Sequence, residues 1–336
     1  MRSDPIRHKL FFFIDESHFP EVIPESFNDP VIKNVDNRNT WYAWTIKTYL
    51  YLKDVFDCEL TSKLPLEGII LYFRGSIGLS DKPTGKQFFI CMVGDGTWHP
   101  YANINVFQNA YQSQFFENGF FMQHWLLLDI IPNSQPFGKT VPTISYFGDP
   151  VNLDPYLRSE EWFAYLEGLG FEWMDKSNND WNNYENVDII VAIRKFNSEI
   201  KFIQRPASKL INTWHGGAVP IMGNESAYRS YKLSDYDYLE ADSIEALKKI
   251  LLKLKTDTIL IKKILENGKE RSKGINNDII KKEWIDFING TAYPQAVKWF
   301  GRSFVFRSIY LLKRFILYRS NALINRFVSN VWLSKK

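Results

Sequence analysis

Short apolar runs that end in polar loops recur through the first half of the chain. The runs at 10–14, 68–73 and 87–93 have the length and the apolar and aromatic content that is typical of buried strands. An aromatic-rich segment at 40–55 is predicted to form a helix. Polar or glycine-bearing loops follow the three strand candidates, namely Asp15-Glu16-Ser17, Arg74-Gly75-Ser76 and Gly94-Asp95-Gly96. This pattern predicts an open α/β sheet, in which ligands bind at the carboxyl ends of the strands.

The alternation stops at 132–142, where three prolines and one glycine mark a linker. Beyond it, strands are predicted at 143–147, 187–193 and 219–222, and helices at 160–169, 208–214 and 243–254. The run VDIIVAI is continuously apolar, as a central strand of a parallel sheet should be. We therefore expect two α/β domains, an N-terminal one at 1–139 and a C-terminal one at 140–286, with a crevice between them.

The segment 287–336 differs from the rest of the chain in charge. It holds nine basic and no acidic side chains, whereas the other residues hold 32 basic and 38 acidic ones. A helix over 299–325 would place on one side Phe304, Val305, Leu311, Leu312, Phe315, Ile316, Ala322 and Leu323. It would place on the other side Arg307, Lys313, Arg314, Asn321 and Asn325. Such a helical tail is suited to an anionic membrane surface, although it can also pack back on the protein after a crossing at 281–289.

The overall composition excludes several classes of protein. The net charge of +3 hides an acidic body, which disfavours nucleic-acid binding. Two cysteines are too few for a disulfide framework and indicate a reducing compartment. The first apolar run is too short for a signal peptide, and no run of 18 residues is both apolar throughout and free of charge. We therefore expect a cytoplasmic protein, peripheral to the inner face of the cell membrane.

The segment 204–226, QRPASKLINTWHGGAVPIMGNES, has the properties of a phosphate site. Pro206 precedes a predicted helix start that Ser208 can cap, and a helix N-terminus presents free N–H groups and a positive dipole. Lys209 adds a positive charge in the first turn. A strand follows, and Glu225 lies in the polar loop at its carboxyl end, where a carboxylate can accept hydrogen bonds from ribose hydroxyls.

The stretch SKLINTWHGGAVPIMGNES resembles the donor-binding signature of GT-B glycosyltransferases that use nucleotide-sugars in bacterial surface polysaccharide biosynthesis. The resemblance covers roughly 144–254 and implies two Rossmann-like domains that face each other across a crevice. It implies that Lys209 contacts the donor diphosphate, that Glu225 holds the ribose or the sugar, and that Arg194 lies near the base or phosphates. Further donor contacts are implied for Gly148, Gln204, Arg205, Ser208, Asn212, Asn224 and Ser226.

One feature departs from this family's pattern. Many retaining members carry two glutamates eight residues apart, and here Gln204 and Asn212 occupy those places. Amides hydrogen-bond to hydroxyls without bringing charge, so the stereochemistry of transfer stays open. The resemblance implies no metal or other cofactor, because the family stabilises phosphate with cations and helix dipoles. The pair Asp235 and Asp237 has metal-ligand spacing but is interpreted as a solvated turn.

A base for an inverting transfer has to come from the acceptor side. Asp15 and Glu16, after the first strand, and Asp95, after a later one, are candidates, with helix or turn capping as the alternative. His124 and His215 lie in apolar surroundings and are interpreted as core histidines.

The function predicted from these patterns is transfer of a sugar from a nucleotide-sugar donor to a bacterial surface glycan, such as lipopolysaccharide, O-antigen or capsule. The expected partners are the donor, a glycan or lipid-linked acceptor and the membrane surface. Two alternatives remain: a non-catalytic scaffold that binds a nucleotide-sugar or glycan, and a sugar-nucleotide epimerase.

Overall fold

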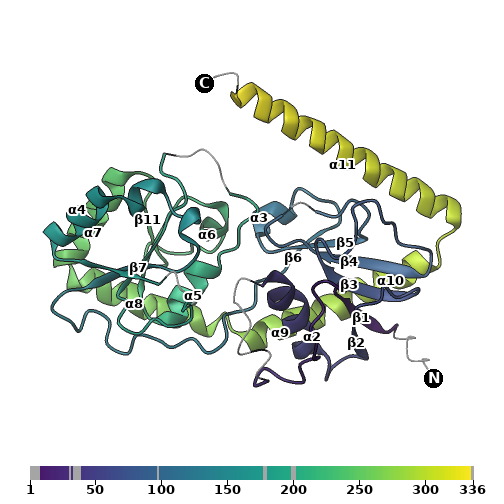
Figure 1. Cartoon of the computed structure of the whole chain (residues 1–336), viewed down its shortest axis with the longest axis horizontal. Helices are drawn as coiled ribbons and strands as arrows, with labels where there is room; N and C mark the ends of the chain where they lie inside the picture. Colours follow the sequence, from purple (N-terminus) through teal and green to yellow (C-terminus); the bar gives the residue numbers. More distant parts are fainter. Residues whose placement is uncertain are drawn as a thin grey trace.

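The chain folds into two lobes, each built on its own parallel sheet, as the computed structural model in Figure 1 shows. The second lobe follows the first along the chain, and the C-terminal helices return to the first lobe. The structure describes residues 8–29, 32, 39–96, 98–176, 180–197 and 202–333. From residue 321 onward only the backbone is described.

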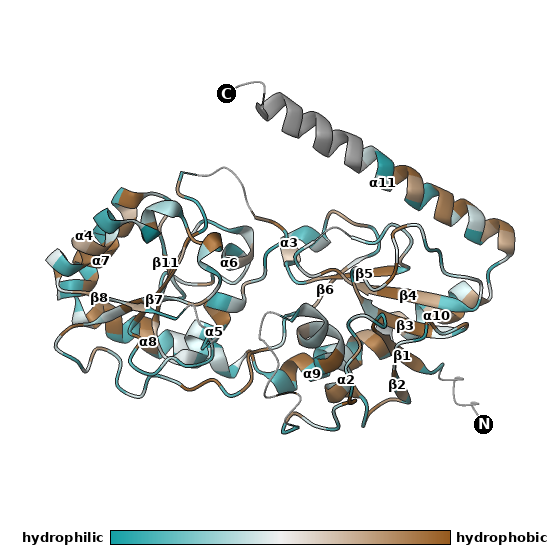
Figure 2. Ribbon diagram, in the orientation of Figure 1, coloured by the Kyte–Doolittle hydropathy of each residue, from teal (hydrophilic) through white to brown (hydrophobic). Residues whose placement is uncertain are grey.

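The first lobe holds a sheet of six parallel strands in the order β2-β1-β3-β4-β5-β6. Its strands are β1 (Leu10–Phe13), β2 (Cys58–Thr61), β3 (Gly68–Phe73), β4 (Gln87–Met92), β5 (Ile104–Phe107) and β6 (Gly119–Phe121). Nearly all residues of β3 and β4 are buried and apolar, because helices or loops cover both faces of the sheet (Figure 2). The helices of this lobe that precede the second lobe are η1 (Tyr42–Ile46), α2 (Lys47–Leu52) and α3 (Ala110–Ser113).

The second lobe holds a sheet of five parallel strands in the order β11-β10-β9-β7-β8. Its strands are β7 (Thr143–Tyr146), β8 (Glu172–Asp175), β9 (Ile189–Ala192), β10 (Val219–Met222) and β11 (Leu239–Glu240). Its helices are η2 (Pro150–Asn152), η3 (Pro155–Arg158), α4 (Glu160–Leu169), α5 (Ser208–Gly216), α6 (Ser226–Ser230), α7 (Ile244–Thr256) and α8 (Thr258–Lys273). Two parallel α/β sheets in separate lobes, with helices at the C-terminus, confirm the predicted fold class.

The helices after α8 pack on the first lobe. These are α9 (Asn277–Phe287), η4 (Ile288–Ala292) and α10 (Tyr293–Phe300). The ring of Phe287 lies 4.4 Å from that of Phe120, and Trp299 Nε1 donates a hydrogen bond to the Thr84 carbonyl at 3.1 Å. The crossing expected at 281–289 therefore starts earlier, at α9, and 288–300 form part of the first lobe.

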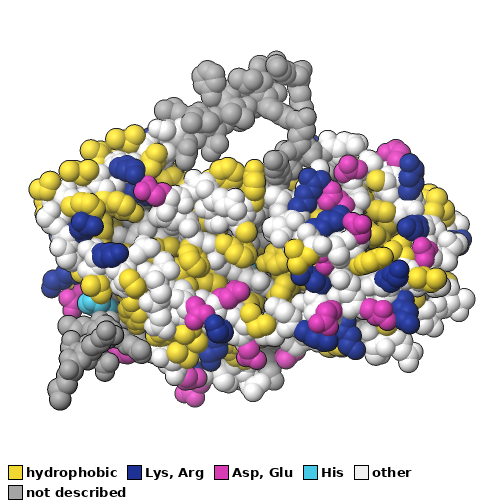
Figure 3. Space-filling view, turned by 180° about the vertical axis from the view of Figure 1, so that it is seen from behind, with side chains coloured by type: hydrophobic (Ala, Val, Ile, Leu, Met, Phe, Trp, Pro, Cys, Tyr) yellow, Lys and Arg dark blue, Asp and Glu magenta, His cyan; other side chains and the backbone are white. Residues whose placement is uncertain are grey.

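The last helix, α11 (Phe304–Leu333), is separated from α10 by a turn, so a single helix over 299–325 is wrong. Its lobe-facing side chains are Tyr310, Leu311, Arg314 and Tyr318. Its apolar residues face solvent instead: Phe304 is 77%, Ile309 64% and Leu312 58% exposed. Figure 3 shows yellow and blue side chains together at the upper left, where α11 starts. Ala322, Leu323, Asn325, Asn321, Arg326, Lys335 and Lys336 lie outside the described side chains.

Within the part of the chain that the structure describes, no helix is both long and apolar enough to cross a bilayer.

Candidate functional site

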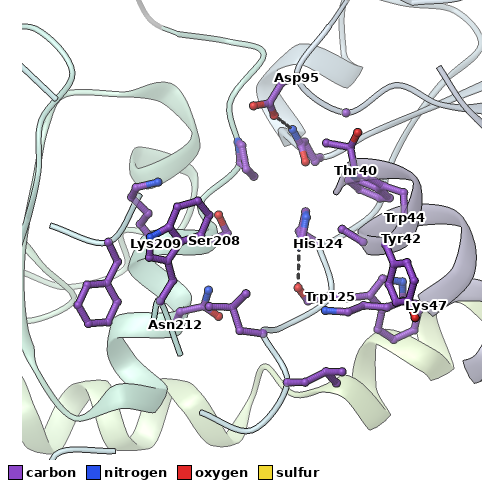
Figure 4. A pocket seen from close by; sticks show the side chains of 18 of the residues that line it. Thr40, Tyr42, Trp44, Lys47, Asp95, His124, Trp125, Ser208, Lys209 and Asn212 are labelled. Atoms are coloured by element: carbon purple, nitrogen blue, oxygen red, sulfur yellow. Dashed lines mark hydrogen bonds between the residues drawn. The ribbon is translucent and has the colours of Figure 1, made fainter. Parts of the chain in front are cut away.

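A cavity of about 250 Å³ lies between the two lobes (Figure 4). In Figure 4, Ser208, Lys209 and Asn212 lie on one side, and Trp44, Lys47 and His124 lie across from them. The first lobe contributes, among others, Thr40, Tyr42, Trp44, Lys47, Asp95, Gln108, His124 and Trp125. The second lobe contributes, among others, Phe147, Arg194, Pro206, Ser208, Lys209, Asn212 and Tyr228.

Beside this cavity lies the point at which the strand order of the second sheet reverses. Strand β7 pairs with β8 on one side and with β9 on the other, so the chain winds outward in both directions from this point. Ligands of open α/β sheets bind at the carboxyl ends of strands at such a switch point. Gly148 follows β7 and Arg194 follows β9, which places both sequence-predicted residues at the switch point.

Gly148 lies against Lys209. Its φ of +151° is unfavourable for other residues, and a Cβ atom there would lie 2.9 Å from Tyr146 Oη and 3.0 Å from Lys209 Nζ. The absence of a side chain therefore lets the Gly148 backbone come close to the lysine ammonium. The same ammonium lies over the ring of Tyr146, 5.2 Å from its centroid.

The N-terminus of α5 faces the same cavity. Ala207, not Ser208, is the N-cap residue, and among the described residues no side chain caps the helix. The expected capping role of Ser208 is therefore wrong: it is the first helical residue and lines the cavity. The first N–H groups of α5 stay available for an anion. One turn further on, Asn212 is buried, and within the described chain its Oδ1 has no hydrogen-bond partner.

Lys209 has a perturbed ionisation. Burial and, to a lesser extent, the charge of Arg194 lower the pKa of its ammonium from 10.5 to about 8, although Glu225 and Asp95 oppose the shift. The ammonium is thus poorly compensated by the protein. An anionic ligand in the cavity would raise this pKa and would be bound more tightly for the same reason.

Arg194 and Glu225 form an ion pair behind the cavity wall. Arg194 Nε donates to Glu225 Oε2 at 3.2 Å, and Nη1 donates to Asn152 Oδ1 at 2.9 Å. Burial alone would lower the pKa of Arg194, but the Glu225 carboxylate raises it. Glu225 is 1% exposed and does not line the cavity. Its Oε2 holds the guanidinium in place, and its Oε1 has no hydrogen-bond partner among the described residues.

The lobes touch through another set of predicted residues. Arg205 forms an ion pair with Asp95, and Gln108 also hydrogen-bonds to Asp95. Asn109 Nδ2 donates to the Arg205 carbonyl at 3.1 Å and to Ser226 Oγ at 3.0 Å.

These contacts join residues that the sequence assigned to opposite sides of the crevice. The backbone carbonyl of Gln204 accepts a hydrogen bond from Gln108 Nε2 at 3.3 Å. Gln204 is exposed and does not line the cavity. Asn224 is partly buried in the loop after β10 and does not line the cavity either.

Asp15 and Glu16 lie outside the cavity. Asp15 hydrogen-bonds to Ser17 and, at 2.7 Å, to His18 Nδ1. Burial raises the pKa of Asp15, but the bonds from Ser17 and His18 outweigh it, so the net shift is downward. Glu16 is exposed. The structure therefore does not bring these two acids together with Lys209.

His124 was interpreted from the sequence as a core residue, but it lines the cavity. Its Nδ1 lies 2.6 Å from the Trp125 carbonyl, which can only accept, so Nδ1 carries the proton and Nε2 is left as the basic atom. Burial lowers the pKa of His124, the Trp125 carbonyl opposes this, and Lys47 lowers it further. His215 differs: its Nε2 lies 2.6 Å from the Ile275 carbonyl, away from the cavity.

Lys47 is a second titratable residue of the cavity that the sequence does not single out. It is buried at the start of α2, and burial lowers its pKa to about 8. Its Nζ lies 3.5 Å from the Leu126 carbonyl. In the sequence, a lysine within an aromatic helix segment looks like any surface lysine, and only the packing of the first lobe shows that Lys47 is buried.

Asp237 is not part of a solvated turn. It is fully buried and ion-paired with Arg271 at 3.1 Å, and it accepts hydrogen bonds from the Leu233 and Ser234 backbones. Asp235 is exposed. The Asp237 carboxylate is therefore a structural group that holds the loop before β11.

Neither a model of a known protein family nor a curated protein sequence matches the chain. Among solved structures, a glycosyltransferase from Rickettsia africae ESF-5 is 12% identical, with a TM-score of 0.48, over 88% of this chain and 100% of that one. HepE of Anabaena, in complex with UDP-glucose, is 10% identical, with a TM-score of 0.47, over 84% of this chain and 100% of that one. TarM is 9% identical, with a TM-score of 0.46, over 73% of this chain, which spans 58% of TarM. Similarity at this level assigns no function.

Proposed function

We propose that the chain transfers a sugar from a nucleotide-sugar donor to a bacterial surface glycan. The observation that supports this most directly is the convergence of Gly148, Arg194 and Lys209 with the uncapped N-terminus of α5 at the switch point of the second sheet. A diphosphate is bound well by two cationic side chains, by free N–H groups of a helix N-terminus, and by a glycine backbone that it can approach closely because no side chain intervenes.

In this proposal the donor diphosphate lies on the α5 N-terminus with Lys209 and Arg194 beside it. As the bond to the sugar breaks, negative charge develops on the leaving phosphate, and these fixed positive groups stabilise it. A catalytic metal is not needed for this role. The second-lobe amide of Asn212, with its unpartnered Oδ1, is placed to accept a hydrogen bond from a donor hydroxyl.

The acceptor enters from the first lobe. His124 lines the cavity, and the bond from its Nδ1 to the Trp125 carbonyl leaves Nε2 as the basic atom. It is the better candidate for the base, because Asp95 is held in an ion pair with Arg205. We also propose that α11 binds the membrane face on which a lipid-linked acceptor lies, because its apolar side chains point outward beside basic ones.

Substitution of Lys209 by alanine tests the donor site. We expect Lys209→Ala to weaken binding of the donor nucleotide by at least roughly tenfold, because one charge-assisted contact to phosphate is lost. Isothermal titration with UDP-, GDP-, CMP- and dTDP-sugars measures the affinity. Lys249→Ala, at an exposed position of α7, is the matched control. Unchanged affinity of Lys209→Ala for every donor that the wild type binds would refute the site.

The same proteins separate transfer from the alternatives. A transferase releases nucleotide only when acceptor is present, whereas an epimerase converts the donor alone and a scaffold does neither. Nucleotide release measured with and without a glycan acceptor distinguishes the three.

A further inference from the structure

A second, polar pocket of about 210 Å³ lies at the far edge of the first sheet. It is formed at the amino ends of β5 and β6, whereas the cavity between the lobes lies toward the carboxyl ends of strands. The helices η4, α10 and α11 close its other side. Amide and hydroxyl groups of Asn103, Asn118, Thr291, Gln295 and Tyr310 line it.

Arg314 of α11 is the cation of this pocket. The residue is 3% exposed, its Nε donates to the Pro100 carbonyl at 3.2 Å, and its guanidinium lies 4.7 Å from the ring centroid of Trp98. Its Nη2 is buried and has no hydrogen-bond partner among the residues that the structure describes. A buried guanidinium with a free N–H group is costly unless an anion completes it.

The one carboxylate that lines the pocket is already engaged. Glu117 accepts a hydrogen bond from Lys313 Nζ at 2.8 Å, and its side chain is 74% exposed. Among the residues that the structure describes, no carboxylate forms an ion pair with Arg314. Burial lowers the pKa of Arg314, while Tyr310 and Glu117 oppose the shift.

The side chain of Asn118 also has only part of its hydrogen-bonding capacity filled by described residues. Its Nδ2 donates to the Ala102 carbonyl at 2.9 Å, while its Oδ1 is buried and unpartnered in the described chain. Within the described chain, the pocket thus combines one cation that has no carboxylate partner with an unpartnered amide oxygen that can accept a hydrogen bond from a ligand hydroxyl. Both features point to a hydroxylated anion.

We infer that this pocket binds a phosphodiester. A diester carries one negative charge, which matches the single guanidinium of Arg314, and its oxygens suit the planar N–H donors of arginine. The neutral donors around Arg314 can satisfy the remaining oxygens, and Asn118 Oδ1 can accept from a glycerol-type hydroxyl. This second site is independent of the donor cavity and of whether the chain transfers a sugar.

The phosphodiester can belong to a soluble compound or to an anionic phospholipid. Arg314 is on α11, whose outward face is apolar, so a lipid head group can reach the pocket while its acyl chains stay beside that helix. The two sources share the chemistry recognised by Arg314 and differ in whether a vesicle is required.

The test compares three variants of the full chain with the wild type. Arg314→Gln removes the guanidinium, and Gln295→Trp narrows the pocket from an exposed position while Arg314 stays in place. Arg319→Gln removes the same charge from an exposed site on the same helix and is the control. The probes are glycerophosphoglycerol in titration calorimetry, and phosphatidylcholine vesicles with and without phosphatidylglycerol in cosedimentation.

We expect saturable binding of at least one probe by the wild type and by Arg319→Gln. Binding should be weaker by roughly tenfold or more in Arg314→Gln, because a charge-assisted hydrogen bond is lost, and also weaker in Gln295→Trp. Binding of glycerophosphoglycerol identifies a head-group site that does not need a bilayer. Binding only to phosphatidylglycerol vesicles identifies the lipid as the ligand of this pocket if Arg314→Gln and Gln295→Trp weaken it and Arg319→Gln does not. If neither probe binds the wild type, or if Arg314→Gln or Gln295→Trp binds as tightly as the control Arg319→Gln, the inference is overturned.

Discussion

Lys209 is the residue at which burial and phosphate binding compete. Its pKa is lowered to about 8, so the fraction of charged ammonium falls as the pH rises through that value. Donor affinity should therefore be constant below pH 8 and should fall above it, by up to roughly tenfold per pH unit.

Calorimetric titration of the wild type with donor, between about pH 6 and pH 10, measures how donor affinity depends on pH. Lys209→Arg provides the control, because a guanidinium stays charged throughout and should flatten the profile. A wild-type affinity that did not change across this range would show that the ammonium does not carry the binding.

His124 allows a separate prediction about chemistry. We expect His124→Gln to lower kcat by about 10²–10⁴-fold with little change in donor affinity, because a general base acts in the transition state. His215→Gln should leave kcat near the wild-type value, since His215 bonds to the Ile275 carbonyl away from the cavity. Steady-state transfer kinetics measure both. If His124→Gln kept its kcat, Asp95 would become the next candidate.

At the scale of elements, α11 exposes apolar side chains to solvent, whereas a helix that packs on a core buries them. Ile309 and Leu312 are 64% and 58% exposed, so Ile309→Glu with Leu312→Glu should leave the fold intact. The double variant should lose binding to anionic vesicles, because carboxylates replace the outward apolar face. Circular dichroism and vesicle cosedimentation check the two statements.

Leu233→Glu is the control for this experiment, since Leu233 is 79% exposed on the second lobe. It should bind vesicles like the wild type. Vesicle binding that survives the double substitution on α11 would contradict the proposed role of this helix.

For the whole molecule, the contact between Asp95 and Arg205 joins the lobes over the cavity. The two side chains are 48% and 34% exposed, so the ion pair contributes only about 0.2–1 kcal/mol to closure. Arg205→Glu should shift the population toward a more open arrangement by a factor of up to about five, because like charges then meet.

Small-angle X-ray scattering should show a larger radius of gyration for Arg205→Glu. The exchanged pair, Asp95→Arg with Arg205→Glu, should restore the wild-type value. If the single and the exchanged variants scattered alike, the ion pair would not hold the lobes.

Most of the fold could be predicted from local patterns. The strands at 68–73 and 219–222 and the helix at 160–169 have the predicted bounds, because a buried apolar run between turn residues is a strong local signal. Strands β2, β5, β6, β8 and β11 were not predicted, since runs of two to four residues such as EWMD carry no clear period. Burial of these strands depends on neighbours far away in the sequence.

The sequence alone determined the two α/β domains and one wall of the candidate site, because 204–226 places a helix start, a lysine and a polar loop within one continuous stretch. Only the tertiary structure decided what faces that wall. His124 and Lys47 come from separate segments of the first lobe, Glu225 turns out to support Arg194, and Asp95 pairs with Arg205. The physical reason is that side-chain direction and burial are set by packing between distant segments, which no local spacing encodes.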